Sequence, residues 1–296
     1  MDLGNAPIVL DGGLATELEA RGHDLSDELW SARLLTDAPE EITAAHEAFF
    51  RAGAAIATTA SYQASFTGFA ARGIGRDEAA RLLRRSVELA AAARDRLPPD
   101  RPRWIAASVG PYGATLADGS EYRGDYGLST SELVAFHRPR LEVLAEAGPD
   151  LLALETVPDA REAAALAEAI EGIGIPAWLS FTVDGTRTRA GQPLAEAFEI
   201  ARDHDGIIAV GVNCCSPADV GPAIALARET TGKPAIAYPN SGERWDAEQR
   251  RWTGPADAGD PRLWVAEGAA IVGGCCRVSP ADIAALKAAV AGAQAP

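Results

Sequence analysis

The feature that most constrains the fold is a repeated pattern, in which a short apolar segment is followed by a helix-like segment. The apolar segments are hydrophobic at successive positions, which is typical of strands buried on both faces of a parallel sheet. Eight such units without a break in composition predict a single (β/α)8 TIM barrel over residues 1–296. A doubly wound sheet is the alternative, but it gives no reason for eight equal units. The predicted strands are residues 7–13, 54–60, 104–110, 150–156, 177–182, 206–214, 234–240 and 270–276, and the predicted helices are 39–53, 77–97, 129–147, 159–170, 193–202, 216–231, 261–268 and 279–291.

Three connections between these units are long. Residues 14–38 are expected to be irregular and contain Trp30. Residues 111–127 are rich in Gly, Asp and Tyr, and residues 241–260 contain Trp245 and Trp252. Long loops in a compact domain are often functional, so we expect the segment 111–127 to have a functional role.

The charge balance excludes some partners. Asp and Glu number 42 against 27 Lys and Arg, which gives a formal net charge of -15. Nucleic acids and anionic membranes bind basic patches, so neither is expected as a partner. The N-terminus has no basic region or apolar run of a signal peptide, and the chain has no apolar stretch of the ~20 residues that a membrane helix needs. We therefore expect a cytoplasmic protein with reduced thiols, in which cysteines are more often metal-binding or catalytic than cross-linked.

Polar residues lie at the C-terminal ends of several of the predicted apolar strands. In (β/α)8 barrels the active site lies at the C-terminal ends of the strands. Capping or loop packing would explain any one of these residues alone, whereas together they fit an active site. The residues at or just after these ends are Asp11, Thr59, Ser61, Tyr62, Glu155, Thr156, Asn213, Cys214, Tyr238, Asn240, Cys275 and Cys276.

The cysteines are the most informative of these residues. Adjacent residues on a strand point to opposite faces, so Cys275 and Cys276 can reach one point only where the strand ends and the backbone turns. Gly273 and Gly274 are expected to supply that conformational freedom. A vicinal disulfide would be strained. Strands six and eight flank strand seven, so Cys214 lies within reach of the same point.

Three thiolates suit zinc, which keeps a fourth position open in catalytic sites. A closed site that also uses Cys215 is the alternative, but it would exclude a substrate. The four histidines (His23, His46, His137 and His204) end no predicted strand and are read as structural or surface residues.

The ligand type favours one chemistry over others. A zinc ion with three thiolates carries a formal negative charge and activates water poorly. It holds another thiol as a thiolate well, because coordination removes a proton otherwise lost near pH ~8.5. Thiol alkylation by a methyl group on a sulfonium or ammonium is therefore favoured. A zinc hydrolase and a non-catalytic zinc-binding or redox protein remain alternatives.

Seven longer segments and the Glu155-Thr156 pair together resemble the zinc-dependent homocysteine S-methyltransferase family, in particular its S-methylmethionine-using branch and, more distantly, betaine–homocysteine methyltransferase. The pairing of GVNC with GGCC is highly specific, and the segments run in the expected order over nearly the whole chain. They are residues 10–18 (LDGGLATEL), 58–65 (TTASYQAS), 108–113 (SVGPYG), 116–122 (LADGSEY), 211–214 (GVNC), 238–243 (YPNSGE) and 273–276 (GGCC).

The resemblance implies methyl transfer from S-methylmethionine, or from S-adenosylmethionine, to zinc-bound homocysteine, forming methionine. It implies Cys214, Cys275 and Cys276 as the Zn²⁺ ligands, while Cys215 is outside the family's ligand set. It also implies that Asp11 and Glu155 lie near the amino group of homocysteine. Asn213 is expected at the substrate site as well, and Tyr62 and Tyr112 are candidates for a cation–π contact with the donor. The chain is shorter than the betaine-using enzymes, so we expect a monomer or a small homo-oligomer.

Overall fold

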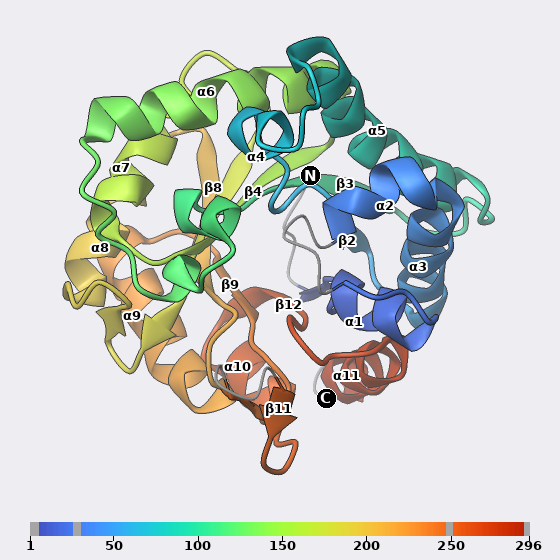
Figure 1. The fold of residues 1–296 in the computed structure, drawn as a ribbon. Helices are drawn as coiled ribbons and strands as arrows, with labels where there is room; N and C mark the ends of the chain where they lie inside the picture. Colours follow the sequence, from blue (N-terminus) through green and yellow to red (C-terminus); the bar gives the residue numbers. More distant parts are fainter. Residues whose placement is uncertain (1–5, 26–30, 247–250, 293–296) are drawn as a thin grey trace.

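The computed structural model describes residues 6–25, 31–246 and 251–292, and its centre is an eight-stranded barrel (Figure 1). All strand pairs in this sheet are parallel, in the order β1-β12-β9-β8-β5-β4-β3-β2. The barrel closes between β1 and β2 through a bridge from Leu10 to Ile56, where the Asp11 amide donates to the Ile56 carbonyl at 3.0 Å. The (β/α)8 prediction is thus confirmed. Its strands are β1 (Ile8–Val9), β2 (Ile56–Thr58), β3 (Trp104–Val109), β4 (Leu151–Val157), β5 (Ala177–Phe181), β8 (Ile207–Asn213), β9 (Ala235–Tyr238) and β12 (Ala269–Val272).

A ring of helices surrounds the barrel, and each barrel strand is followed by one of them (Figure 1). Ser129 caps the helix after β3 with a full capping box, in which the Glu132 carboxylate accepts from the Ser129 amide. None of the described helices has the length and apolar character needed to cross a membrane. The ring consists of α3 (Pro39–Ala52), α5 (Arg76–Asp95), α6 (Thr130–Glu146), α7 (Ala160–Ala169), α8 (Leu194–Arg202), α9 (Val220–Thr231), α10 (Pro261–Ala266) and α11 (Pro280–Gly292).

The connections hold short elements that the sequence pattern did not reveal. The expectation of an irregular segment over residues 14–38 is wrong, because α1 (Leu14–Ala20) and α2 (Ser31–Asp37) lie within it. Each has only seven residues, too few for a clear helical period. Trp30 lies outside the described residues. The other additional elements are α4 (Phe66–Ala70), η1 (Tyr112–Leu116), η2 (Ser120–Tyr122), η3 (Pro217–Asp219) and the hairpins β6 (Val183–Asp184) with β7 (Arg187–Thr188) and β10 (Arg244–Asp246) with β11 (Arg251–Thr253).

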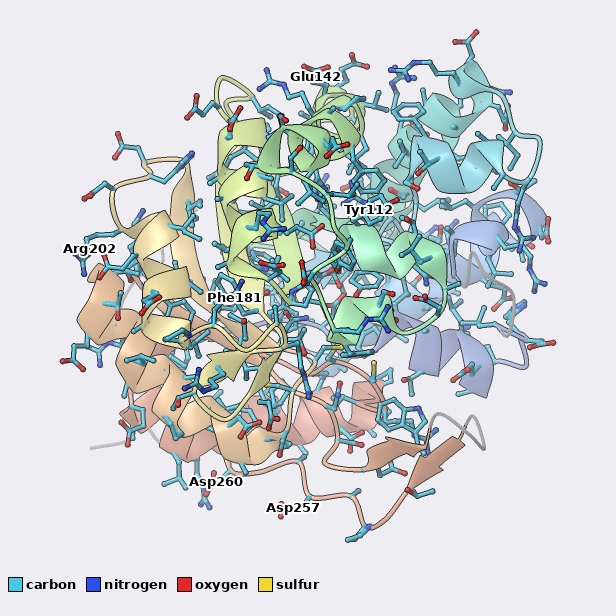
Figure 2. All side chains as sticks on the ribbon, turned by 60° about the vertical axis from the view of Figure 1, so that its left-hand side comes forward. Tyr112, Glu142, Phe181, Arg202, Asp257 and Asp260 are labelled. Carbon is cyan, nitrogen blue, oxygen red and sulfur yellow. The ribbon has the colours of Figure 1, made fainter. Side chains whose placement is uncertain are left out.

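The strands separate two apolar layers. One fills the space between barrel and helices, and the other fills the barrel interior, where Trp178 is the largest buried side chain. In Figure 2 the charged residues Glu142 and Arg202 project from the outer helices, whereas Phe181 lies inside the molecule. Residues two apart on a strand share a face. Leu151 and Ala153 point into the barrel, so the same alternation turns Glu155 inward at the C-terminal end of β4.

The same alternation makes the top layer of the barrel interior polar. On β2, β3, β5 and β9, an inward apolar residue is followed two positions later by a hydroxyl-bearing residue. The inward pairs are Ile56 with Thr58, Ala106 with Ser108, Trp178 with Ser180, and Ile236 with Tyr238. The strands therefore deliver hydrogen-bonding groups to one end of the barrel.

Candidate metal centre and substrate pocket

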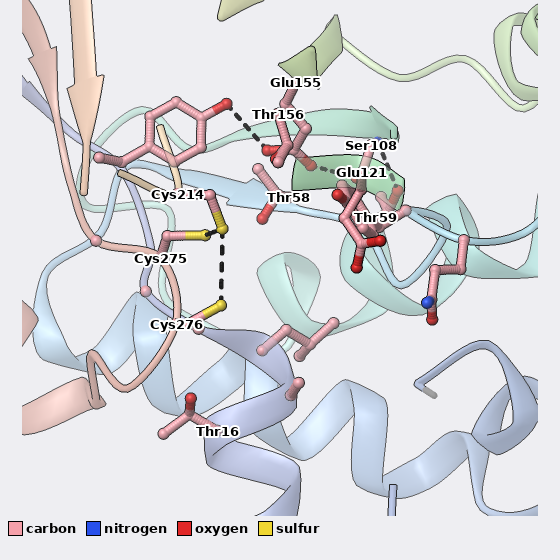
Figure 3. A pocket seen from close by; sticks show the side chains of 18 of the residues that line it. Thr16, Thr58, Thr59, Ser108, Glu121, Glu155, Thr156, Cys214, Cys275 and Cys276 are labelled. Atoms are coloured by element: carbon pink, nitrogen blue, oxygen red, sulfur yellow. Dashed lines mark hydrogen bonds between the residues drawn. The ribbon is translucent and has the colours of Figure 1, made fainter. Parts of the chain in front are cut away.

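Three cysteines meet at the C-terminal end of the barrel. The Cys214 Sγ lies 2.7 Å from the Cys275 Sγ and 3.6 Å from the Cys276 Sγ (Figure 3). Cys214 follows β8 in the left-handed region, with φ 50°, and this bend turns its side chain toward the end of β12. Among the described residues, these three form the only group of three or more His, Cys, Asp and Glu side chains close enough to share a metal ion.

The glycines before the cysteines have a different role from the expected one. Neither Gly273 nor Gly274 has a positive φ. A Cβ on Gly273 would lie 2.7 Å from the Leu10 Cβ, and one on Gly274 would overlap the Val278 side chain. These positions need glycine because the backbone passes too close to its neighbours for a side chain, and the close passage brings the two cysteines to the barrel axis.

Cys215 does not join the cluster. It is buried among the apolar residues between barrel and helices, on the other side of the strand end. Its thiol is free, as are those of the other three cysteines. The alternative prediction of a closed metal site with all four cysteines as ligands is therefore wrong.

The three sulfurs fit a metal ion. All lie within 4.8 Å of one another, and a tetrahedral zinc site with Zn–S bonds of ~2.3 Å separates its sulfurs by ~3.8 Å. Hydrogen bonds from Cys214 and Cys275 hold the pKa of Cys276 well below that of a free thiol, whereas the hydrogen bonds that Cys275 makes raise its own pKa. Three thiols this close cannot all ionise unless a cation compensates the charge.

Glu155 is held by two hydroxyl groups above the barrel core. The Ser108 Oγ donates a short hydrogen bond to its Oε1, and the Tyr238 Oη donates to its Oε2 at 2.9 Å. The Tyr238 oxygen accepts in turn from the Trp178 Nε1 at 2.9 Å and lies 2.7 Å from the Ser180 Oγ. Burial raises the pKa of Glu155 to about 7, so its charge responds to whatever binds beside it.

Asn213 holds the neighbouring strand end in an unusual conformation. Its Oδ1 accepts from the Thr156 amide at 2.7 Å, and its Nδ2 donates to the Thr156 Oγ1 at 2.7 Å. Thr156 has φ 59°, which a β-branched residue rarely adopts. The two hydrogen bonds stabilise this turn, and the turn directs Thr156 into the pocket.

Only some of the residues expected to bind substrate line the pocket. Tyr62 and Glu155 line the pocket. Asp11 is buried beneath it and accepts from the Thr58 amide at 2.8 Å and from the Thr58 Oγ1 at 3.1 Å. Burial raises the pKa of Asp11 well above its ordinary value. Asn213 also lies behind the pocket wall rather than in it.

Tyr112 points away from the pocket. Its ring packs against Tyr126 at 5.3 Å and against Phe136 at 4.9 Å, measured between ring centroids, and Tyr112 is not among the residues that line the pocket. The aromatic residue that the same loop brings to the site is Tyr122, whose Oη lies 3.6 Å from the Cys214 Sγ.

Sequence reasoning missed Glu121 and Tyr122, the two pocket residues that come from the segment after β3. No strand pattern marks them, and the only available signals were the length of this loop and the motif at residues 116–122. The segment is anchored at its base, where the Tyr112 amide donates to the Glu162 Oε1 at 2.5 Å and the Gln63 Nε2 donates to the Ala114 carbonyl at 3.2 Å. It therefore covers the barrel mouth in a defined position.

The pocket is acidic and lacks basic side chains. Glu121 and Glu155 line it together with the three cysteines, and none of its described lining residues is Lys, Arg or His. The four histidines thus lie outside its described lining, with His46 and His137 in helices as expected. The remaining lining residues are Gly12, Gly13, Leu14, Ala15, Thr16, Thr58, Thr59, Tyr62, Gln63, Ser108, Tyr122, Thr156, Tyr238 and Gly274.

Comparisons with known proteins agree on one family. A family model described as Homocysteine S-methyltransferase matches residues 8–290. The homocysteine S-methyltransferase YbgG of Bacillus subtilis is 47% identical over 93% of this chain and 92% of its own length. The homocysteine S-methyltransferase of Escherichia coli is 46% identical over 95% of this chain and 94% of its own. The crystal structure of the metallated form of E. coli MmuM superposes with a TM-score of 0.85 at 45% identity, covering 95% of this chain and 96% of that one.

Proposed function

The chain belongs to the homocysteine S-methyltransferase family and is an enzyme of that class, and we propose that it transfers a methyl group from S-methylmethionine to L-homocysteine with a Zn²⁺ ion held by Cys214, Cys275 and Cys276. The observation that carries this proposal is the cluster of three thiols in a pocket with no described basic side chain. S-adenosylmethionine is a second donor of the same chemical class. The free thiols fit a reducing compartment, so we assign the reaction to the cytoplasm.

The reaction is a nucleophilic displacement between two sulfur atoms. The homocysteine thiol first loses its proton to solvent, and its sulfur then attacks a methyl group of the sulfonium. One carbon–sulfur bond forms while the bond from that methyl group to the donor sulfur breaks, and the electron pair stays on the donor sulfur. With S-methylmethionine both products are methionine. The zinc ion, when bound, lowers the pKa of the homocysteine thiol so that it is a thiolate at neutral pH.

The acceptor is held by residues on the strand ends. We assign Glu155 to the amino group of homocysteine, because its carboxylate lines the pocket in a fixed orientation between Ser108 and Tyr238. Asp11 is assigned an indirect role, since Thr58 already occupies its carboxylate oxygens. Its hydrogen bonds hold Thr58, which lines the pocket. Asn213 likewise acts through Thr156.

The donor is expected beside the aromatic residues. Tyr62 and Tyr122 line the same pocket, and their half-buried rings reduce the access of water to it. Exclusion of water protects the thiolate from competing proton transfer and strengthens electrostatic attraction to a cation. Hydrolysis is disfavoured because a zinc ion held by three thiolates would carry a formal negative charge and would activate water poorly.

The test is an assay of purified protein with homocysteine and each donor in turn, with zinc content measured before and after treatment with a chelator. We expect methionine to form from S-methylmethionine, activity to disappear with the metal, and zinc to restore it. A cobalt-substituted protein should show the absorption of a site with thiolate ligands, and the spectrum should change when homocysteine is added. Methyl transfer that persists in metal-free protein, or its absence with every sulfonium donor, would refute the proposal.

A further inference from the structure

Glu121 is a buried carboxylate that the fold itself does not use. It belongs to η2, is 5% exposed and lines the pocket. Its Oε2 is shielded from solvent and has no hydrogen-bond partner among the described residues. In Figure 3 its side chain points into the pocket, across from the cysteines. Burying an unpartnered carboxylate is costly, so its retention calls for a partner that arrives with a ligand.

The other carboxylates near the pocket are already engaged. The oxygens of Glu155 accept from Ser108 and Tyr238, and those of Asp11 accept from Thr58. None of the described lining residues carries a positive charge that would pair with Glu121. The missing partner is therefore a cation on a substrate.

The surrounding contacts fix the position of Glu121 and leave its Oε2 without a partner among the described residues. Ser120 is fully buried, and its amide donates to the Asp118 Oδ1 at 3.0 Å. A Cβ on Gly113 would lie 2.6 Å from the Glu121 amide nitrogen, so the two segments are in direct backbone contact. On the other side, the Tyr122 Oη lies 3.6 Å from the Cys214 Sγ. The carboxylate is thus held in the wall of the pocket that also contains the three cysteines.

From this arrangement we propose that Glu121 is the counter-ion of the positively charged sulfur of the methyl donor, and that it makes the pocket select cationic donors. This inference rests on the proposed function, since it concerns the second substrate of that reaction. Homocysteine brings one cation, its amino group, to which Glu155 is assigned because it lines the pocket and each of its oxygens has a lone pair left beside the hydrogen bonds from Ser108 and Tyr238. The sulfonium is the further cation at the reacting end, and the buried carboxylate that remains for it is Glu121.

The proposal has a kinetic signature. The sulfonium loses its positive charge as the methyl group leaves, so a counter-ion stabilises the bound donor more than the transition state. Glu121→Gln keeps the shape of the side chain and removes its charge. We expect this variant to raise the KM for S-methylmethionine by ~10-fold or more, as for the loss of a buried charge-assisted contact, without lowering kcat. The KM for homocysteine and the zinc content should not change.

An uncharged analogue of the donor separates charge from shape. In 2-amino-5-methylhexanoate a CH group replaces the sulfonium sulfur, so the two molecules differ by one positive charge at that atom. Its Ki is measured in competition with S-methylmethionine at saturating homocysteine. The wild-type Ki should exceed the KM for S-methylmethionine by ~10-fold or more, and Glu121→Gln should reduce that ratio toward one. Asp125→Asn, which removes an exposed charge from the same loop, is the matched control and should leave the ratio unchanged.

Each contrary outcome is informative. Equal binding of the charged and uncharged molecules by the wild-type enzyme would overturn the proposal without any variant. In Glu121→Gln, an equal loss of affinity for both would assign Glu121 to the shared amino acid portion instead, and unchanged affinities for both would remove it from donor recognition. Glu121→Asp keeps the charge and should retain most of the preference for the cation. If the wild-type enzyme transfers no methyl group at all, it is the proposed function that fails.

Discussion

The hydroxyl group of Tyr238 offers the most demanding test of the site's construction. Tyr238→Phe removes one oxygen and leaves the ring in place, but that oxygen has three neighbours. Trp178 loses the acceptor of its Nε1, and Glu155 loses the donor to its Oε2. Ser180 keeps the Asn213 Oδ1 as its acceptor at 2.8 Å, so it contributes little to the loss.

The size of the effect follows from these contacts. An unsatisfied buried donor costs ~1–3 kcal/mol, and a hydrogen bond to a charged group contributes ~1.5–3 kcal/mol. Trp178 and Tyr238 are both almost fully buried, so bulk water does not replace the lost partner of the indole. Allowing for the desolvation that the hydroxyl no longer requires, we expect Tyr238→Phe to lower the free energy of unfolding by about 3 kcal/mol. The KM for homocysteine should rise because Glu155 is no longer oriented.

The assay is urea unfolding of the two single variants Tyr238→Phe and Trp178→Phe and of the double variant, together with steady-state kinetics. The double variant removes both partners, so its loss should be smaller than the sum of the single losses by ~1 kcal/mol or more. Tyr112→Phe removes a hydroxyl outside the pocket and serves as the matched control, with wild-type KM expected. A change below ~1 kcal/mol in Tyr238→Phe with an unaltered KM would refute the reasoning.

Three other predictions test separate parts of the structure. His46 is fully buried and its pKa is lowered to about 4, so its neutral form contributes stability above the unfolded pKa near 6.5, and this stability is lost as the pH falls toward 4. Between pH ~7.5 and ~5, His46→Leu should therefore lose ~2 kcal/mol less of its free energy of unfolding in urea than wild type does. An equal pH dependence of the two unfolding free energies would contradict the burial argument. Cys276→Ala should lose zinc and activity while Cys215→Ala keeps both, as measured by metal analysis and assay, and equal zinc contents would contradict the three-ligand site. Gly113→Ala should displace the segment that carries Glu121 and raise the KM for the sulfonium donor but not for homocysteine, and equal rises would indicate a general distortion.

The parts of the structure that correspond to a regular pattern of apolar residues could be predicted from the sequence. Consecutive apolar residues marked the eight barrel strands, and the meeting of Cys214 with Cys275 and Cys276 followed from the neighbourhood of strands six to eight. Alternation along β4 explains why Glu155, which was expected at the strand end, faces inward. Its assignment to substrate stays a prediction.

What could not be predicted depends on contacts between distant segments. Asp11 looks available in the sequence, but barrel closure brings Thr58 alongside it and occupies its oxygens. Tyr112 and Tyr122 are indistinguishable as loop aromatics until packing with Phe136 turns one outward and the other reaches Cys214. Side-chain direction in a loop has no period, so a sequence reveals only that the loop is long.

The site therefore has two parts, one carried by the strand ends and one carried by the loop after β3. The cysteines and Glu155 lie at or just beyond strand ends, within a closed ladder of backbone hydrogen bonds, and a change in their position would disturb the barrel itself. Glu121 and Tyr122 lie on a segment held mainly by side-chain contacts such as that from Glu162. Substitutions there shift the pocket wall without altering the barrel. Because the strand ends provide the groups assigned to the thiol acceptor and the loop provides those assigned to the donor, the same barrel is able to keep its acceptor chemistry while its choice of methyl donor changes.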